Sequence, residues 1–140
     1  MTDDASKIDE IEARRAERKA ETAKARNAQY VIDVAKIDEL EVQHGDDRIA
    51  VLKMPSFVAG LPTVVVVRTP EPSKFERFRQ MVRKANGAAE AQGAAKDLLA
   101  ASCIVYPDDD TYKRMREAWP SIHDNAGMEA IRLGEAVGKA

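Results

Sequence analysis

Four consecutive valines, residues 64–67 of the stretch TVVVVR (Thr63–Arg68), constrain the fold more than any other feature of the sequence. β-branched side chains favour the pleated geometry of a strand. An unbroken apolar run, in place of the alternation typical of a strand with one wet face, indicates that both faces are buried. A further strand is predicted at Arg48–Met54, where apolar residues alternate. The chain therefore needs other elements to cover this sheet.

Two more short strands are predicted upstream, at Tyr30–Val34 (YVIDV) and Leu40–Gln43 (LEVQ). The stretch His44–Asp47 (HGDD) has the composition of a turn. We therefore expect LEVQ, HGDD and RIAVL to form a β-hairpin. Pro55–Pro62 (PSFVAGLP) reads as a loop because proline and glycine interrupt it.

Three or four helices are predicted downstream of the valine run. Ser73 is the expected N-cap of the first helix, and Asn86-Gly87 its C-terminal stop. Residues 88–102 form an alanine-rich helix, and residues 103–107 (CIVYP) an extended link or a short strand. The inward positions expected on the four helices are Phe75, Phe78, Val82 and Ala85, then Ala91, Ala95, Leu98 and Ser102, then Tyr112, Met115 and Trp119, and finally Ile122, Ala126, Ala130, Leu133 and Val137. The fold class is α+β, a small antiparallel sheet or hairpin covered by helices.

Residues 1–28 differ in composition from the rest of the chain. Their only large aliphatic side chains after Met1 are Ile8 and Ile11, and residues 2–28 carry seven acids and seven bases. Ala, Glu, Lys and Arg favour a helix, while the absence of an apolar stripe leaves it without a face to dock. A protruding charged helix and a solvated tail are both consistent with this segment, which can become ordered against a partner. Residues 29–140 are expected to form a single α+β domain.

Charge and hydropathy exclude several classes of function. The formal net charge is −2, which gives no attraction to nucleic acid or to an anionic membrane. The first residues lack the apolar core of a signal peptide, and no apolar stretch approaches the length of a membrane span, so we expect an intracellular protein. One segment is markedly basic. Its pattern favours a solvated helix face, then a contact with an acidic protein partner, and least of all a nucleic-acid site. Its basic residues are Lys74, Arg77, Arg79, Arg83 and Lys84.

The triplet Asp108–Asp110 is the most conspicuous candidate for metal chemistry. Adjacent aspartates on one turn point apart, whereas a divalent cation needs several converging oxygen ligands. We therefore interpret the triplet as a helix start, in which Asp108 or Asp109 caps free N–H groups after Pro107. His44 and His123 have no partner at metal-ligand spacing. A pair between His123 and the single cysteine, Cys103, is the remaining nucleophile candidate, and Cys103 looks like a small buried hydrophobe.

Partner contacts are expected at apolar residues near loops. These candidates are Phe57, Val58 and Leu61 in the proline-rich loop and the stretch Trp119–Ile122. Aromatic anchors commonly dominate interfaces. Core packing is the alternative for each, and for Trp119 it is the stronger one. No catalytic, cofactor-binding or metal-binding residue is predicted.

Part of the chain resembles the tail assembly chaperones of tailed bacteriophages and prophages. The likeness covers a little over half of the chain. It is carried by a strand leading into Arg68–Pro70, by the pattern Phe75, Phe78 and Val82, and by Cys103–Pro107 followed by Tyr112, Met115, Trp119 and Pro120.

The resemblance implies a non-enzymatic protein without cofactors. Such chaperones bind the tape-measure protein, keep it soluble and help to recruit tail-tube subunits in the cytoplasm of the bacterial host, and some are also made in frameshift-extended forms. We also expect a homo-oligomer as one option, and we expect neither nucleic acid nor a membrane among the partners. The alternative is a structural virion component, such as a head–tail connector or a minor tail protein, in which the N-terminal helix locks neighbouring subunits.

Overall fold

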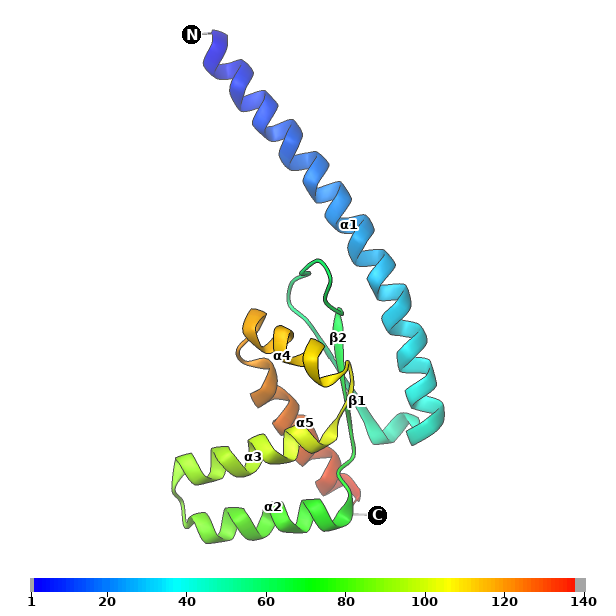
Figure 1. Cartoon of the computed structure of the whole chain (residues 1–140), viewed down its shortest axis with the longest axis vertical. Helices are drawn as coiled ribbons and strands as arrows, with labels where there is room; N and C mark the ends of the chain where they lie inside the picture. The colour runs from blue at the N-terminus through cyan, green and yellow to red at the C-terminus, as the bar shows by residue number, and fades with distance from the viewer. Residues whose placement is uncertain (1, 138–140) are drawn as a thin grey trace.

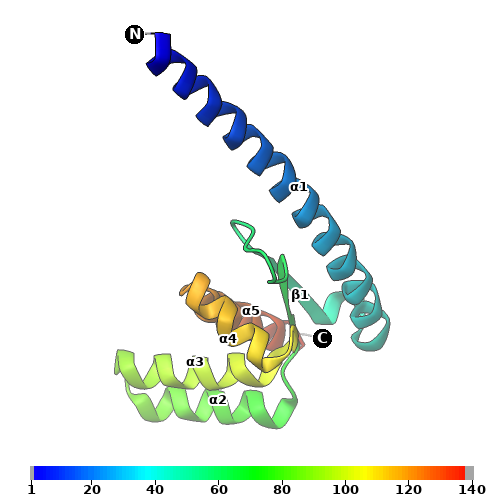
Figure 2. The ribbon, with the colours of Figure 1, turned by 45° about the horizontal axis from the view of Figure 1, so that its top comes forward.

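The computed structural model describes residues 2–137, with side chains from residue 4 onward, and it confirms the α+β class. A helix of 43 residues, α1 (Thr2–His44), leads into a small domain and projects far beyond it (Figure 1). The domain combines a three-stranded antiparallel sheet with four shorter helices (Figures 1 and 2). The proposed boundary between residues 28 and 29 falls inside α1, which continues through it without a break.

The prediction of strands at Tyr30–Val34 and Leu40–Gln43 was wrong, because both segments belong to α1. Gly45, at a φ of 99°, ends this helix, and a short 3₁₀ turn, η1 (Asp46–Arg48), follows. The expected hairpin from residue 40 to residue 52 therefore does not form. The segment YVIDV has high β-propensity, but the helical spacing of the residues that contact the sheet overrides this local preference.

The three strands are β1 (Ile49–Lys53), β2 (Val64–Arg68) and β3 (Ile104–Tyr106), in the order β1-β2-β3. Thus β1 pairs with β2 across the proline-rich loop, and β3 arises from the segment that was expected as a link or a strand. The prediction for the central strand is confirmed, since all four of its valines are buried.

The two faces of β2 are covered by different parts of the chain. Val65 and Val67 belong to the main core with the four shorter helices, whereas Val66 packs with Leu40 of α1 in a second, smaller cluster. Figure 2 shows α1 on one side of the sheet and the shorter helices on the other. Both faces of the valine run are therefore dry, which explains why its sequence does not alternate.

The four shorter helices are α2 (Pro72–Ala85), α3 (Ala89–Cys103), α4 (Asp109–Ala118) and α5 (Ile122–Val137). Ser73 is not the N-cap of α2: Glu71 occupies that position and Pro72 begins the helix. Proline suits the first residue of a helix for two reasons. Its fixed φ is already helical, and the N–H that proline lacks would have no hydrogen-bond acceptor within the helix at this position. The predicted stop at Asn86-Gly87 is confirmed, because both residues adopt positive φ.

Most of the predicted inward positions are buried or half-buried, with three exceptions. Ala91 is exposed, Leu98 is 59% exposed and Val137 is 42% exposed, so their prediction as inward residues was wrong. In α3 the register instead buries Leu99, because two adjacent leucines on a helix cannot share one face.

Two glycines of α5 allow close helix packing. A Cβ at Gly134 would lie 2.6 Å from the ring of Phe75, and a Cβ at Gly127 would lie 2.5 Å from the side chain of Lys96. These positions let α5 approach α2 and α3 more closely than any larger residue permits. The cost that glycine adds to the helix is thus offset by packing.

A buried carboxylate fixes α1 to the sheet. Asp33 is fully buried and accepts four hydrogen bonds. Thr63 donates its N–H (2.8 Å) and its hydroxyl (2.5 Å) to Oδ2, while Tyr106 (2.5 Å) and Gln29 (3.1 Å) donate to Oδ1. Burial, together with the bond to Asp33, raises the pKa of Tyr106, so this hydroxyl stays protonated and donates. These four bonds are an acceptable environment for a buried charge.

Candidate partner-binding site

The five residues expected at a partner surface separate into two groups. Leu61, Trp119 and Ile122 are buried in the main core, with 5%, 8% and 3% of their surface exposed. Phe57 is half-buried, and Val58 is 38% exposed. Of these five residues, Phe57 and Val58 offer surface to a partner, and the other three side chains pack the domain.

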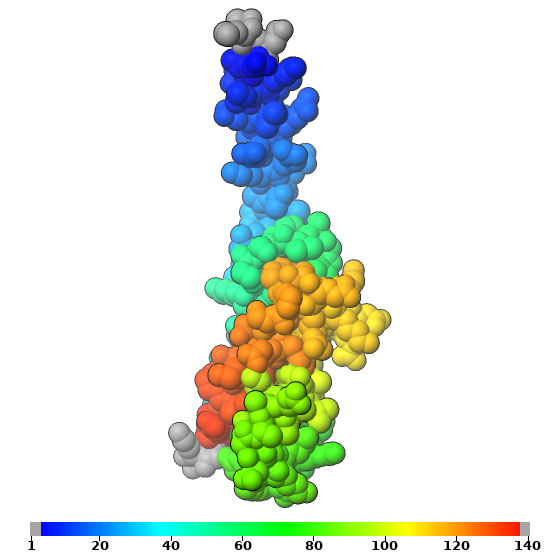
Figure 3. Space-filling model, turned by 90° about the vertical axis from the view of Figure 1, so that its left-hand side faces the viewer, coloured from blue at the N-terminus to red at the C-terminus, as the bar shows by residue number. Residues whose placement is uncertain are grey.

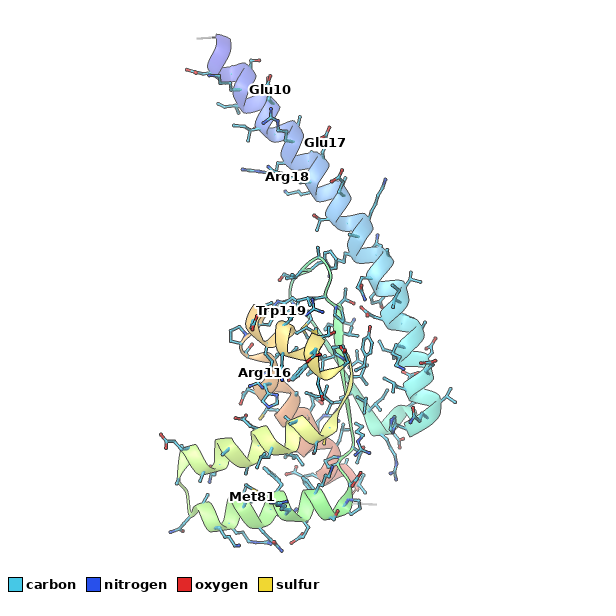
Figure 4. All side chains as sticks on the ribbon, in the orientation of Figure 1. Glu10, Glu17, Arg18, Met81, Arg116 and Trp119 are labelled. Carbon is cyan, nitrogen blue, oxygen red and sulfur yellow. The ribbon has the colours of Figure 1, made fainter. Side chains whose placement is uncertain are left out.

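Trp119 explains why the proline-rich loop lies over the core. Its indole N–H donates to the hydroxyl of Ser56 in that loop (3.2 Å), and Leu61 of the same loop is buried in the same cluster (Figure 4). The loop is closed by a bond from the N–H of Met54 to the carbonyl of Thr63 (2.9 Å). Of the three apolar loop residues that were expected to contact a partner, Leu61 therefore instead helps to hold the loop against the core.

The groove between α2 and α3 is the better candidate for a binding surface. It has a volume of about 200 Å³. The apolar side chains along it are Phe78, Met81, Ala95, Leu98 and Leu99. Leu98 is largely exposed, while Met81 is half-buried and lies between the two helices (Figure 4). This is a shallow apolar trough that fits one or two side chains of a partner.

A second hollow, of about 370 Å³, adjoins this groove at Phe78, between α2, α3 and α5. Val82 and Ile131 contribute to it, together with Gly93 and Lys96. The space-filling view shows α2 and α3 forming one end of the molecule, remote from the N-terminal half of α1 (Figure 3). The two hollows together place apolar side chains of α2, α3 and α5 along this end of the domain.

Four of the five basic residues of α2 divide into two sets by their contacts. Arg79 lies over the ring of Phe75, 4.6 Å from its centroid, and Arg83 forms an ion pair with Glu76 (3.0 Å). Lys74 and Arg77 instead line the groove, and in the described part of the chain neither makes an ion pair within 4 Å. The groove thus has an apolar floor and positive charge along its α2 wall. Such a surface suits an amphipathic helix with an acidic flank.

The aspartate triplet has the structural role that the sequence predicts. The carboxylate of Asp108 accepts a hydrogen bond from the N–H of Thr111 (3.2 Å), and α4 begins at Asp109. The side chain of Thr111 is the main cause that lowers the pKa of Asp108, and the bond from the backbone N–H contributes in the same direction. Within residues 2–137 no group of three or more His, Cys, Asp or Glu side chains is arranged to hold a metal ion.

His123 and Cys103 do not form a pair. The Nε2 of His123 lies 3.1 Å from the carbonyl of Asp97, and its Nδ1 lies 2.8 Å from the hydroxyl of Tyr112. A carbonyl only accepts, so Nε2 carries the proton and Nδ1 accepts from Tyr112. Burial lowers the pKa of His123, which favours this neutral form, and burial raises the pKa of the Cys103 thiol. His44 lies in the last turn of α1.

Sequence reasoning missed the groove because its two walls come from two different helices, and each helix was interpreted separately. Leu98 was assigned to the core, and the basic residues of α2 were interpreted as a solvated face. The adjacent leucines at positions 98 and 99 carry the signal, since one of them must face outward.

Two further findings concern membrane-spanning helices and similarity to known proteins. Along residues 2–137, no helix has both the length and the apolar character that a bilayer crossing requires. Comparisons with protein-family models, with curated proteins and with solved structures found no match to the chain.

Proposed function

We propose that this chain is a tail assembly chaperone of a tailed bacteriophage or prophage, and that it binds the tape-measure protein during assembly of the tail tube. The sequence resemblance carried by Cys103–Pro107 and the residues around Trp119 supports the family. The compartment that follows is the cytoplasm of the bacterial host. The mechanism requires binding and release of a client, without turnover of a substrate.

The observation that carries this proposal is the groove between α2 and α3. Its apolar floor around Leu98 suits the apolar face of a client helix, and Lys74 and Arg77 suit acidic residues beside that face. Burying an apolar side chain in such a groove contributes about 1.5–3 kcal/mol when burial is complete. Covering the apolar face of a long helical client in this way keeps the client from aggregating.

A structural virion component, such as a head–tail connector or minor tail protein, is the second candidate. The observation that favours it is the exposed first half of α1, which projects from the domain as a stiff arm (Figures 1 and 3). Arms of this kind suit the locking of neighbouring subunits. Presence of the chain in purified mature particles favours this candidate, and its absence from them favours the chaperone.

The test is co-expression with the tape-measure protein, using two matched variants. Leu98→Glu places a charge in the groove, whereas Met128→Glu makes the same change at an equally exposed position of α5 (59% and 58% exposed). We expect the soluble client that is captured with the chain to fall at least about tenfold with Leu98→Glu and to stay unchanged with Met128→Glu. Equal capture by both variants would refute the groove as the client site.

A further inference from the structure

The exposed part of α1, residues 4–26, which we term the arm, has charges of opposite sign along its length. Asp4–Glu12 carries four acids and one base, and residues 13–26 carry six bases and two acids. The net charges are therefore −3 for the tip and +4 for the remainder. Every side chain of the arm is exposed, including Ile8 (56%) and Ile11 (51%).

A cleft lies between the basic part of the arm and the loop after β1. Its volume is about 980 Å³. Among the described residues that line it, five are cationic and none is acidic. The cations are Arg15, Arg18, Lys19, Arg26 and Lys53. Thr22, Tyr30 and Phe57 also contribute to the lining. This concentration of like charge favours an anionic occupant that also has apolar surface.

The tip of the arm has the chemistry that this cleft requires, and it lies on the same face of α1. Steps of three and four residues lead from Asp4 through Ile8 and Ile11 to Arg15 and Arg18, so these side chains share one face. That face is the one turned to the cleft.

The opposite face of α1, which is turned away from the cleft, also carries acidic side chains. Glu10 and Glu17 are absent from the cleft lining, and Figure 4 shows Glu17 and Arg18 on opposite sides of the helix. Such an outward acid provides a control for any contact made by the inner face.

The tip cannot reach the cleft of its own chain. With a rise of about 1.5 Å per residue, Ile8 lies about 27 Å along the axis from Arg26. The helix between them is continuous. An occupant from this sequence must therefore come from a second copy.

We propose that two copies associate through their arms, which pair antiparallel about a two-fold axis near Arg15. In this register Asp4 of one copy lies opposite Arg26 of the other, and Glu12 lies opposite Arg18. Ile8 then faces the small side chains around Thr22, where close approach is possible. Because the contact is isologous, both tips and both clefts are used in a closed dimer.

A nucleic-acid occupant is less well supported by the same residues. The chain has a net charge of −2, so a polyanion is repelled by the molecule as a whole. A polyanion also leaves Ile8 and Ile11 exposed, whereas the arm of a second copy covers them. The dimer goes beyond the proposed function, because it does not involve the groove between α2 and α3.

The experiment is sedimentation equilibrium of the full chain, with charge reversals that the symmetry makes reciprocal. Glu12→Arg and Arg18→Glu each place like charges opposite one another twice per dimer. We expect each variant to weaken the dimer Kd about tenfold or more. An equimolar mixture of the two variants restores both pairs and should recover the dimer. Glu17→Arg, on the outer face, makes the same charge change as Glu12→Arg and should leave the Kd unchanged.

Salt gives an independent readout. The wild-type chain should be dimeric in about 0.05 M NaCl and dissociate toward the 15.4 kDa monomer in about 1 M NaCl, where the Debye length is about 3 Å. Four results would overturn the proposal: a wild-type monomer at low salt, an assembly larger than a dimer, equal effects of Glu12→Arg and Glu17→Arg, or a mixture that stays monomeric. A shift of the low-salt species to a nucleic-acid complex, with no protein dimer, would also overturn it.

Discussion

Replacing Asp33 by alanine tests the attachment of α1 to the sheet. The carboxylate accepts four hydrogen bonds, of which three come from Thr63 and Tyr106 at 2.5–2.8 Å. A hydrogen bond to a charged group contributes about 1.5–3 kcal/mol, and a buried donor left alone costs about 1–3 kcal/mol. Thr63 and Tyr106 are only half-buried, so water can reach part of these groups in the variant. Alanine also removes the desolvation cost of a buried charge.

We therefore expect Asp33→Ala to lower the free energy of unfolding by about 2–4 kcal/mol. Urea denaturation followed by the fluorescence of the single tryptophan, Trp119, reports the core rather than the arm. The matched control is Asp38→Ala, which changes an exposed aspartate of the same helix and should cost no more than about 0.5 kcal/mol.

A double-mutant cycle with Tyr106→Phe sharpens this test. Tyr106→Phe should destabilise the wild-type chain by about 1.5–3 kcal/mol, and by less than about 0.5 kcal/mol once Asp33 is alanine, because the bond is then already lost. Equal costs for Asp33→Ala and Asp38→Ala would refute the anchoring role. So would a cost of Tyr106→Phe that is the same in both backgrounds.

Three further predictions concern packing, pH and the arm. Gly134→Ala should destabilise the fold by about 1–3 kcal/mol, because the added Cβ clashes with Phe75. Gly93→Ala has open space around its Cβ and should stabilise the fold by up to about 1 kcal/mol. Urea denaturation measures both changes, and the same sign for both would contradict the packing argument. Because burial lowers the pKa of His123, the unfolded chain binds a proton that the native state does not, so stability should be full above about pH 6.5 and fall below it. The melting temperature should therefore drop between about pH 7.5 and about pH 5.5, and His123→Asn should reduce that drop; an unchanged pH dependence would contradict it. Deleting residues 2–25 should change the free energy of unfolding by less than about 1 kcal/mol, because the described side chains of this segment are exposed, and a loss above about 2 kcal/mol would mean that the segment docks within the chain.

The secondary structure was predictable where one local signal dominates. Four adjacent valines have no good alternative to a buried strand, and β2 occupies their positions. A proline followed by aspartates is a strong helix start, and Asp108 caps α4 as expected. In both cases, local propensity and tertiary packing favour the same structure.

The prediction failed in α1 where local propensity and packing disagree. YVIDV favours a strand, yet Tyr30, Val31 and Ile32 lie exposed on a helix. Asp33 and Leu40 contact the sheet on one face of that helix. These two residues are seven positions apart, which places them on the same face of a helix. One of them is an aspartate, so a search for regularly spaced apolar residues does not find this buried face.

The candidate surfaces show the same division between sequence and structure. Composition and local sequence pattern indicated a charged N-terminal segment without an apolar face, and an α+β domain around a buried strand, because these depend on residue type and local order. Which of Leu98 and Leu99 faces outward, and whether Leu61 lies in the core or on a contact loop, were decided by helix register and by the position of Trp119. These outcomes depend on contacts between residues far apart in the chain, such as the 63 positions that separate Ser56 from Trp119. The tertiary structure therefore determined the surfaces, because exposure is a property of the packed chain and not of any single segment.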